Sequence, residues 1–367
     1  MKTVLQEIAN DPASLIIGNL PLPVPAPGSR EILIRVYCAA LNRLDLLQSA
    51  GSYPVPAGAS PVLGIEVSGS IVAMGDRCTS DLKVNDQIMG LVPGGGYSEF
   101  CIADERTIMH AIPGVPPDVL AAIPEAFLTA YQLCFKLANV QPGEAVLLHA
   151  AASSVGQAAI QMLTLKGARV YCTVRSEAKR QRCLELGAVA ATLIDFPTDL
   201  SFSEWAIAAN DGKPIDVVLD PVGSAYFQEN VVSLGIDGRL ILYGLMGGAA
   251  VEDPMLLNKL LAKRLSVIAT TLRSRTDDYK KDLIEALKSD PVGIPAIASG
   301  AIKVTVDRTY ELDQVLEAHD YMRRNKNIGK IILSVTSTAS AIEFFQRELQ
   351  SLDERNHINI DAEQMSK

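Results

Sequence analysis

The sequence predicts an α/β protein in which a doubly wound parallel-sheet (Rossmann) domain is combined with a partly barrel-like β domain. Two observations predict it. β-branched runs broken by Gly and Pro fill the chain up to residue 124, and strand-length and helix-length segments alternate from residue 125. The first texture is typical of short strands joined by turns, and the second of βαβ units. A chain of 367 residues is long enough for two such domains.

The elements follow in order along the chain. In the first part strands are expected at 31–40, 64–74, 87–92 and 97–103. In the second part the expected strands are 146–148, 168–174, 189–194, 216–219 and 239–243, and the expected helices are 155–165, 177–186 and 225–234. Beyond residue 272 we expect a helix at 280–288, a strand at 304–310, a helix at 313–323 and a strand at 330–335.

This order predicts a nucleotide-binding domain of residues 125–271 inserted into a discontinuous domain of residues 1–124 and 272–335. Residues 336–367 form a C-terminal extension that is polar except for an apolar stripe of Ile342, Phe345, Leu349 and Leu352. So short a helix has little stability by itself. Docking on the protein's own surface is therefore favoured over a partner-binding coil.

Composition and charge exclude several classes. The residues are 48% hydrophobic and 20% charged, which is ordinary for a folded enzyme, and the net charge of −9 argues against general binding of nucleic-acid backbones. The six cysteines form no CxxC pair, so a metal clip or redox couple is not expected. The N-terminus carries Glu7 and Asp11, unlike a signal or transit peptide, and no apolar stretch could span a bilayer. A cytoplasmic location without membrane contact is expected.

A candidate phosphate-binding turn lies between an expected strand and an expected helix at residues 149–156, which read HAAASSVG. Small residues there let the backbone approach a pyrophosphate, whose charge is met by N–H groups at the helix N-terminus. The residues assigned to the cofactor are Ala152, Ser153, Ser154, Val155 and Gly156. Serines replace the usual glycines except at Gly156, so by itself the stretch also fits a plain tight turn.

The end of the next expected strand indicates which dinucleotide binds. An Asp or Glu at this place would bind the ribose 2′-hydroxyl of NAD, but the chain has Arg175 and Ser176, with Lys179 one helical turn later. These side chains supply charge-assisted donors to a 2′-phosphate. The pattern favours NADPH over NADH, and the alternative is a solvated basic helix start.

Several other segments, taken in order, match one family. They are 39–45 (AALNRLD), 63–69 (LGIEVSG), 93–96 (PGGG), 123–130 (IPEAFLTA), 243–248 (YGLMGG), 272–275 (LRSR) and 325–330 (NKNIGK). On these motifs the chain resembles the zinc-free medium-chain dehydrogenases/reductases of the zeta-crystallin-like quinone oxidoreductase family, and most closely the branch of the tumour-suppressor-inducible quinone oxidoreductase. The resemblance covers about residues 1–335 and implies a GroES-like catalytic domain beside the Rossmann domain.

The resemblance also implies roles for individual residues. Asn42 and Asp45 would lie at the catalytic cleft, Tyr53 would face cofactor and substrate, and Thr129 would help to hold the nicotinamide ribose. The residues implied to close around the nicotinamide are Gly244, Leu245, Met246, Leu272, Ser274 and Asn327. The chain departs from the family at the Ser153-Ser154 pair and at Phe196, where relatives often have a Tyr near the adenine ribose.

The chemistry expected at this cleft needs no metal. Zinc-dependent relatives have Cys or His ligands where this chain reads Ala40-Leu41-Asn42-Arg43, and Gly-His-Glu where it reads Gly64-Ile65-Glu66. A quinone or conjugated enone is already electrophilic, so positioning it against the nicotinamide replaces much of a metal's work. We expect hydride transfer from NADPH to such a substrate, with Tyr53 and Asn42 orienting its oxygen and water or Tyr53 providing a proton.

Two further expectations concern assembly and histidines. The stretch 265–271 is expected to be a strand that, in relatives, pairs across a two-fold axis, which predicts a homodimer. The four histidines are scattered without ligand spacing, and none is assigned a catalytic role.

Two rival functions remain open from the sequence. An NADPH-dependent enoyl-thioester reductase would use the same fold and cofactor, although no dedicated basic patch for a coenzyme A phosphate is identifiable. An NADPH-binding regulatory or structural protein with little turnover is the rival from another class. The Asn42, Asp45 and Tyr53 set favours an enzyme.

Overall fold

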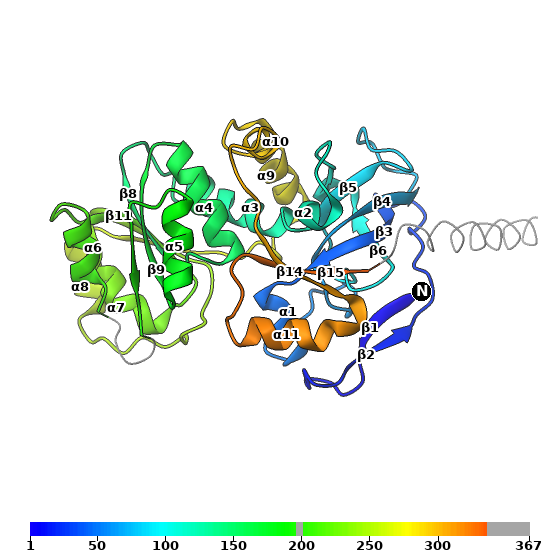
Figure 1. The fold of residues 1–367 in the computed structure, drawn as a ribbon, viewed down its shortest axis with the longest axis horizontal. Helices are drawn as coiled ribbons and strands as arrows, with labels where there is room; N and C mark the ends of the chain where they lie inside the picture. Colours follow the sequence, from blue (N-terminus) through cyan, green and yellow to red (C-terminus); the bar gives the residue numbers. More distant parts are fainter. Residues whose placement is uncertain (196–200, 336–367) are drawn as a thin grey trace, which may run out of the picture.

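The computed structural model of the protein describes residues 1–195 and 201–335 (Figure 1). Phe196 and the stripe of Ile342, Phe345, Leu349 and Leu352 lie outside the described residues. Within the described part of the chain, no helix combines the length and apolar character needed to cross a membrane.

The nucleotide-binding half is built on a six-stranded parallel sheet with the order β10-β9-β8-β11-β12-β13. Its strands are β8 (Ala145–His149), β9 (Arg169–Val174), β10 (Ala190–Leu193), β11 (Ile215–Asp220), β12 (Leu234–Leu242) and β13 (Ser266–Ala269). The helices of this half are α4 (Ser154–Leu165), α5 (Glu177–Glu185), α6 (Ser203–Ala209), α7 (Ser224–Ser233) and α8 (Leu256–Ala262). The strand order reverses between β8 and β11, which is where dinucleotides bind in open parallel sheets.

The other half is a seven-stranded sheet that takes strands from both ends of the described chain, in the order β14-β15-β3-β4-β5-β7 with β6 paired to β3. These are β3 (Glu31–Ala40), β4 (Glu66–Met74), β5 (Gln87–Leu91), β6 (Phe100–Asp104), β7 (Ile108–His110), β14 (Val306–Glu311) and β15 (Lys330–Ser334). A hairpin of β1 (Lys2–Gln6) and β2 (Leu15–Asn19) forms a separate two-stranded sheet that packs on this half through Val4 and Leu15. The helices are α1 (Arg43–Ser49), α2 (Pro117–Ala121) and α11 (Val315–Arg323). The antiparallel pairing of β15 with β3 brings residues near 330 beside residues near 40.

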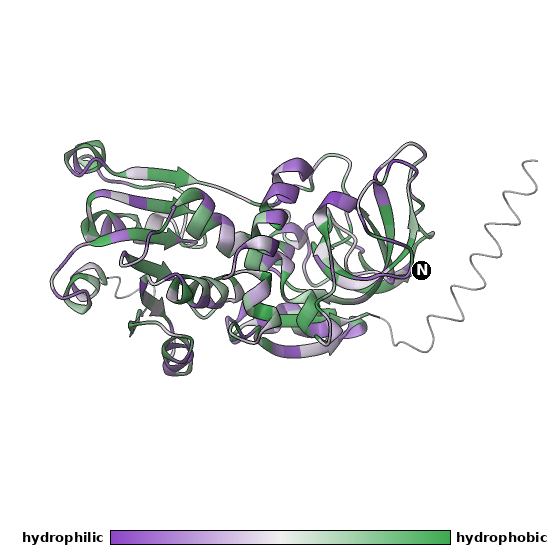
Figure 2. Cartoon of the chain, turned by 90° about the horizontal axis from the view of Figure 1, so that it is seen from above, coloured by the Kyte–Doolittle hydropathy of each residue, from purple (hydrophilic) through white to green (hydrophobic). Residues whose placement is uncertain are grey.

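The middle of the molecule joins the two halves (Figure 1). It holds α3 (Pro124–Tyr131), the π-helical turn η2 (Gln132–Leu137), α9 (Asp277–Ser289) and α10 (Ile294–Ala298). One apolar core runs through it, since Met89, Leu128, Val146 and Leu283 belong to a single buried cluster. Hydrophobic residues also follow the strands of both sheets (Figure 2). The halves are therefore packed against each other through α3 and α9.

The predicted fold class is confirmed: a doubly wound parallel sheet is combined with a GroES-like β domain. The strand predicted at 31–40 is β3 without change, and the helix predicted at 155–165 is α4 to within one residue. Six short helices are additions to the prediction: α1, α2, α3, α6, α8 and α10. They have five to eight residues, too few for a helical period to stand out from the surrounding sequence.

Candidate cofactor site and active site

The turn after β8 has the geometry of a phosphate-binding turn. Ala150 takes a left-handed conformation with φ of 50°, and a side chain at Gly156 would place its Cβ 2.4 Å from the Ala151 carbonyl oxygen. Gly156 is therefore required for α4 to start so close to the turn. Ser153 is the N-cap of α4, and its Oγ accepts a hydrogen bond from Gly156 N at 3.1 Å. Serine in place of the usual glycine thus stabilises the helix end at which a pyrophosphate would bind.

A buried hydrogen-bond chain fixes the carboxyl ends of three strands behind this turn. His149, on β8, contacts Thr173 Oγ1 on β9 through Nδ1 at 2.8 Å and Asn230 Oδ1 through Nε2 at 2.7 Å. Asn230 donates to Asp220 at the end of β11 at 2.9 Å. Burial lowers the pKa of His149 to about 4, so its ring is neutral at pH 7. These contacts are those of a structural histidine.

Cations gather beyond the end of β9. Ser176 caps α5, and Lys179 Nζ donates to the backbone oxygen of Asn325 at 2.6 Å. Arg43, which comes from α1 in the other half, donates to Oδ1 of the same asparagine at 2.6 Å. The pKa of Lys179 is lowered by burial first and then by the charges of Arg175 and Arg43. Arg43 therefore joins the predicted Arg175, Ser176 and Lys179, and together they form a place that an anion would stabilise.

The segment before β15 closes one side of the nucleotide turn. Gly329 N donates to Ala152 O at 3.2 Å, and Asn327 Nδ2 donates to Gly329 O at 2.9 Å. The structure thus joins Asn327 to Ala152 through Gly329, although the two residues come from different halves. The segment before β15 is therefore in contact with the candidate phosphate-binding turn.

The predicted nicotinamide loops also come from several elements. In the loop after β12, Gly244 and Met246 lie close to Pro221, and the side chains of Leu245 and Met246 are exposed. Leu272 is buried, and Ser274 hydrogen-bonds Thr271 through their hydroxyl groups at 2.5 Å. The exposed loop side chains are free to pack on a ligand.

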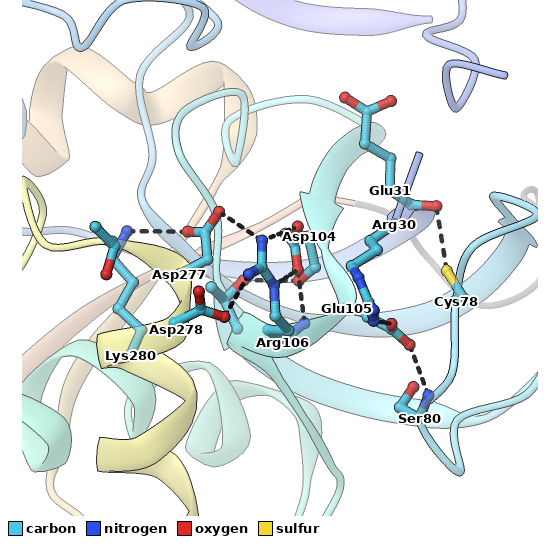
Figure 3. Close-up of polar contacts among 12 residues, drawn as sticks. Arg30, Glu31, Cys78, Ser80, Asp104, Glu105, Arg106, Asp277, Asp278 and Lys280 are labelled. Carbon is cyan, nitrogen blue, oxygen red and sulfur yellow. Dashed lines mark hydrogen bonds and ion pairs between the residues drawn. The ribbon is translucent and has the colours of Figure 1, made fainter. Parts of the chain in front are cut away.

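The segment that carries Leu272 and Ser274 leads into the N-terminus of α9, which is anchored by ion pairs. Arg106, in the short helix η1 (Glu105–Thr107), pairs with Asp104 at 2.8 Å and with Asp278 on α9 at 2.5 Å (Figure 3). Asp277 lies 3.6 Å from the same guanidinium. The acidic first turn of α9 is therefore tied to the seven-stranded sheet, which fixes the entry to the segment before it.

A buried polar network of Lys330, Glu66 and Asn42 lies in the half that holds the seven-stranded sheet. We call this half the catalytic half and the network its polar floor. Lys330 Nζ lies 2.5 Å from Glu66 Oε1 and donates to Asn42 Oδ1 at 2.7 Å. The Asn42 amide donates to Glu66 Oε1 at 2.8 Å and to Ala40 O at 3.3 Å. Lys330 is 2% exposed and Glu66 is fully buried. All polar atoms of the Asn42 side chain are thus engaged, so orienting a substrate oxygen would require it to leave one of these partners.

Asp45 is a structural anchor in this arrangement. Its carboxylate is fully buried and accepts hydrogen bonds from Asn42 N at 2.8 Å and from Gly64 N at 3.1 Å. Burial raises its pKa to about 6, against the effect of these bonds. Asp45 thereby joins the start of α1 to the loop before β4. Its predicted catalytic role stays a prediction, since these contacts position Asn42 and do not face the cleft.

Tyr53 and Thr129 both interact with Glu125, whose backbone N–H donates to Glu66 of the polar network. The Arg273 guanidinium lies 5.5 Å from the Tyr53 ring centroid and is held by Gln48 Oε1 at 2.8 Å and Pro93 O at 3.0 Å. Burial raises the pKa of Tyr53, while Arg273 lowers it. Thr129, on α3, donates to Glu125 Oε1 at 3.3 Å.

Glu125 and Lys330 are polar residues of this site that were not expected from the sequence. Glu125 is partly exposed, its N–H donates to Glu66 Oε2 at 2.8 Å, and burial together with the Glu66 charge raises its pKa to about 7. The sequence signal that could have identified them is that each is a charged residue inside a family segment, 123–130 for Glu125 and 325–330 for Lys330. Among the described residues, no group of three or more His, Cys, Asp or Glu could hold a metal ion.

Comparisons with known proteins agree with this architecture. Residues 28–139 match the alcohol dehydrogenase GroES-like domain, and residues 154–289 match the zinc-binding dehydrogenase family. The probable quinone oxidoreductase of Schizosaccharomyces pombe is 25% identical over 335 residues, which cover 91% of this chain and 97% of that relative. The structure of Escherichia coli quinone oxidoreductase complexed with NADPH has a TM-score of 0.78 and 26% identity, covering 91% of this chain and 100% of that one.

A much longer relative is also similar. A phenolphthiocerol/phthiocerol polyketide synthase of Mycobacterium tuberculosis is 30% identical over 320 residues. The match covers 86% of this chain, which spans only 14% of that relative.

With both domain families matched in order, the chain belongs to the medium-chain dehydrogenase/reductase family, a family of nicotinamide-dependent oxidoreductases. Within that family it falls in the quinone oxidoreductase branch, as the sequence motifs predicted.

Proposed function

We propose that the protein is an NADPH-dependent oxidoreductase that reduces a quinone or a conjugated enone without a metal. The observation that carries the proposal is the group of three cations, Arg43, Arg175 and Lys179, beyond the end of β9, two of which converge on Asn325. A dianionic 2′-phosphate matches this donor set, whereas the hydroxyl of NADH does not.

The residues present fit a bound NADPH. The amides at the start of α4 and the turn from Ala152 to Gly156 would hold the pyrophosphate, and Thr129 and Asn327 would lie near the nicotinamide ribose. The bound cofactor supplies a hydride. The chain's own residues orient the acceptor, since Tyr53 is held beside the Arg273 guanidinium and can donate its hydroxyl to a substrate oxygen.

The buried network supports chemistry without zinc. Asn42 lies in the stretch where zinc-dependent relatives have Cys or His ligands, and Glu66 lies in the stretch where they have Gly-His-Glu. In this chain Lys330 already supplies a positive charge there. The Lys330 ammonium pairs with the Glu66 carboxylate, which would otherwise be available as a metal ligand. A substrate that is electrophilic by itself suits such a site.

Steady-state oxidation of NADPH tests the proposal directly. The purified protein should oxidise NADPH with at least one member of a panel of quinones and enones, and should prefer NADPH to NADH by about 100-fold in kcat/KM. Equal rates with both cofactors would remove the role assigned to the cations. Binding of NADPH without any oxidation would favour the regulatory or structural protein instead.

An enoyl-thioester reductase is the second candidate, favoured by the similarity to a polyketide synthase. Such an enzyme must accept a long acyl chain and its carrier. Turnover of enoyl-CoA that exceeds turnover of every quinone would establish it.

We also propose a homodimer formed through β13. This strand lies at the edge of the six-stranded sheet, with Val267 40% exposed, and the neighbouring α8 presents Leu257 at 79% and Leu261 at 78% exposure. An open strand edge beside exposed leucines is a surface that pairing with a second copy would cover. Sedimentation should give a dimer at micromolar concentration, and Leu257→Asp together with Leu261→Asp should give a monomer. A wild-type monomer would contradict the proposal.

A further inference from the structure

The buried network leaves two carboxyl groups, Asp45 and Glu125, without a cation of their own, and the Asp45 carboxylate is stabilised by two backbone N–H groups. Glu66 uses Oε1 for Lys330 and Asn42, and Oε2 for the backbone N–H of Glu125. Lys330 is thereby committed to Glu66. One ammonium group in a site withdrawn from water does not neutralise two carboxylates. The second carboxylate of the pair, Glu125, is therefore the group that retains a proton.

The other charged groups around Glu125 do not change this result. Lys280, on α9, acts on Glu125 but lies 3.5 Å from Asp277. Arg273 is held by Gln48 and Pro93. Tyr53 is neutral at pH 7, because burial raises the pKa of its phenol further. Burial and the neighbouring Glu66 charge accordingly raise the pKa of Glu125 to about 7.

Glu125 lies next to residues that are assigned to the cofactor and the substrate. Glu125 lies in the first turn of α3, one helical turn before Thr129, and its Oε1 accepts from the Thr129 hydroxyl at 3.3 Å. Its charge acts on Tyr53 and on Arg273, whose guanidinium lies 5.5 Å from the Tyr53 ring centroid. As a residue, Glu125 is partly exposed, whereas Asp45 and Glu66 are fully buried. Among these three residues, Glu125 is the one that retains accessible surface.

We propose that Glu125 is the proton donor of the reduction, a role that rests on the proposed function. When bound, NADPH would supply a hydride from its C4–H bond to the quinone or enone, so that the nicotinamide would be oxidised and the substrate reduced. Negative charge develops on the substrate oxygen. The O–H bond of Glu125 then breaks, its proton goes to that oxygen, and the carboxylate regains a proton from water.

Glu125→Gln is the main test, because glutamine keeps the shape and the acceptor for Thr129 but cannot transfer the proton. We expect kcat to fall by about 100-fold while the dissociation constant of NADPH, measured by fluorescence, stays within twofold. Glu125→Asp should retain part of the rate. Glu317→Gln, at an exposed position on α11, is the matched control and should change neither quantity.

The dependence of rate on pH separates proton donation from a structural effect. The wild-type rate should fall as pH rises through about 7, because ionised Glu125 has no proton to give. Glu125→Asp should keep a falling limb, and Glu125→Gln should lose it. In the ligand-free protein, the infrared difference spectrum between wild type and Glu125→Gln should show a protonated carboxyl band that disappears as pH rises through about 7, above the range near pH 6 in which Asp45 and Asp220 titrate.

The outcomes distinguish this role from the proposed function. An active wild type whose Glu125→Gln variant keeps both its rate and its falling limb would overturn Glu125 alone. So would an infrared spectrum showing Glu125 ionised at pH 6. A wild type that binds NADPH but reduces no quinone or enone would overturn the proposed function, and the role of Glu125 with it.

Discussion

The cofactor turn and the polar floor of the catalytic half are built in opposite ways. In the turn, Ser153 bonds Gly156 and Ser176 bonds Lys179, so each cap joins residues three apart. In the floor, Lys330 bonds Asn42, which is 288 positions away. The first kind of contact is dictated by local sequence, and the second depends on the pairing of β15 with β3. The turn should therefore tolerate change better than the floor.

Lys330→Met should give the largest effect. Removing the ammonium leaves the fully buried Glu66 carboxylate without its cation, and such a loss costs about 3–5 kcal/mol of unfolding free energy. Urea unfolding followed by circular dichroism measures it. Adding Glu66→Gln to Lys330→Met should restore most of the stability, because both charges of the Glu66–Lys330 pair are then removed. If Lys330→Met lowered the unfolding free energy by less than about 1 kcal/mol, the polar floor would contribute no more to stability than the turn does.

The sequence predicts contacts between neighbouring residues better than contacts between residues that are far apart along the chain. The turn at 149–156 and the basic end of β9 were predicted correctly as elements, since they depend on neighbouring residues. Asn42 and Thr129 were placed at the site only through the family resemblance. Lys330, Glu125 and Arg43 gained roles only from the structure, because strand pairing and helix packing bring them to their partners.

Glu125→Gln should change the pH dependence of stability. The folded-state pKa of about 7 lies above the ordinary value of 4.5, so the stabilising contribution of Glu125 is complete below pH 4.5 and is lost as pH rises through 7. Ionised Glu125 therefore costs up to about 3 kcal/mol at pH 8. Relative to wild type, the variant should gain stability between pH 5 and 8. A constant difference across that range would show that Glu125 is ionised throughout.

Arg43→Ala should weaken NADPH binding by about 10-fold, or about 1.4 kcal/mol, and leave NADH binding unchanged. The reason is that Arg43 joins Lys179 at Asn325 from the other half of the molecule. Arg324→Ala removes an exposed arginine paired with Asp320 and is the control. Fluorescence titration with both cofactors measures the effect. Equal weakening of NADH and NADPH would mean that Arg43 holds the halves together and does not read the phosphate.

Ser153→Ala should have the smallest effect and examines the cofactor turn itself. The Ser153 hydroxyl accepts from Gly156 N, so alanine removes an N-cap and should lower the unfolding free energy by about 1 kcal/mol. Thr276→Ala removes the equivalent cap of α9 and should cost a similar amount. Because the hydroxyl is already engaged within the helix end, the affinity for NADPH should stay within twofold. A large loss of NADPH affinity without loss of stability would mean that Ser153 binds the pyrophosphate directly. The Ser153 hydroxyl would then serve ligand binding, whereas the side chains of the polar floor serve contacts with distant parts of the chain.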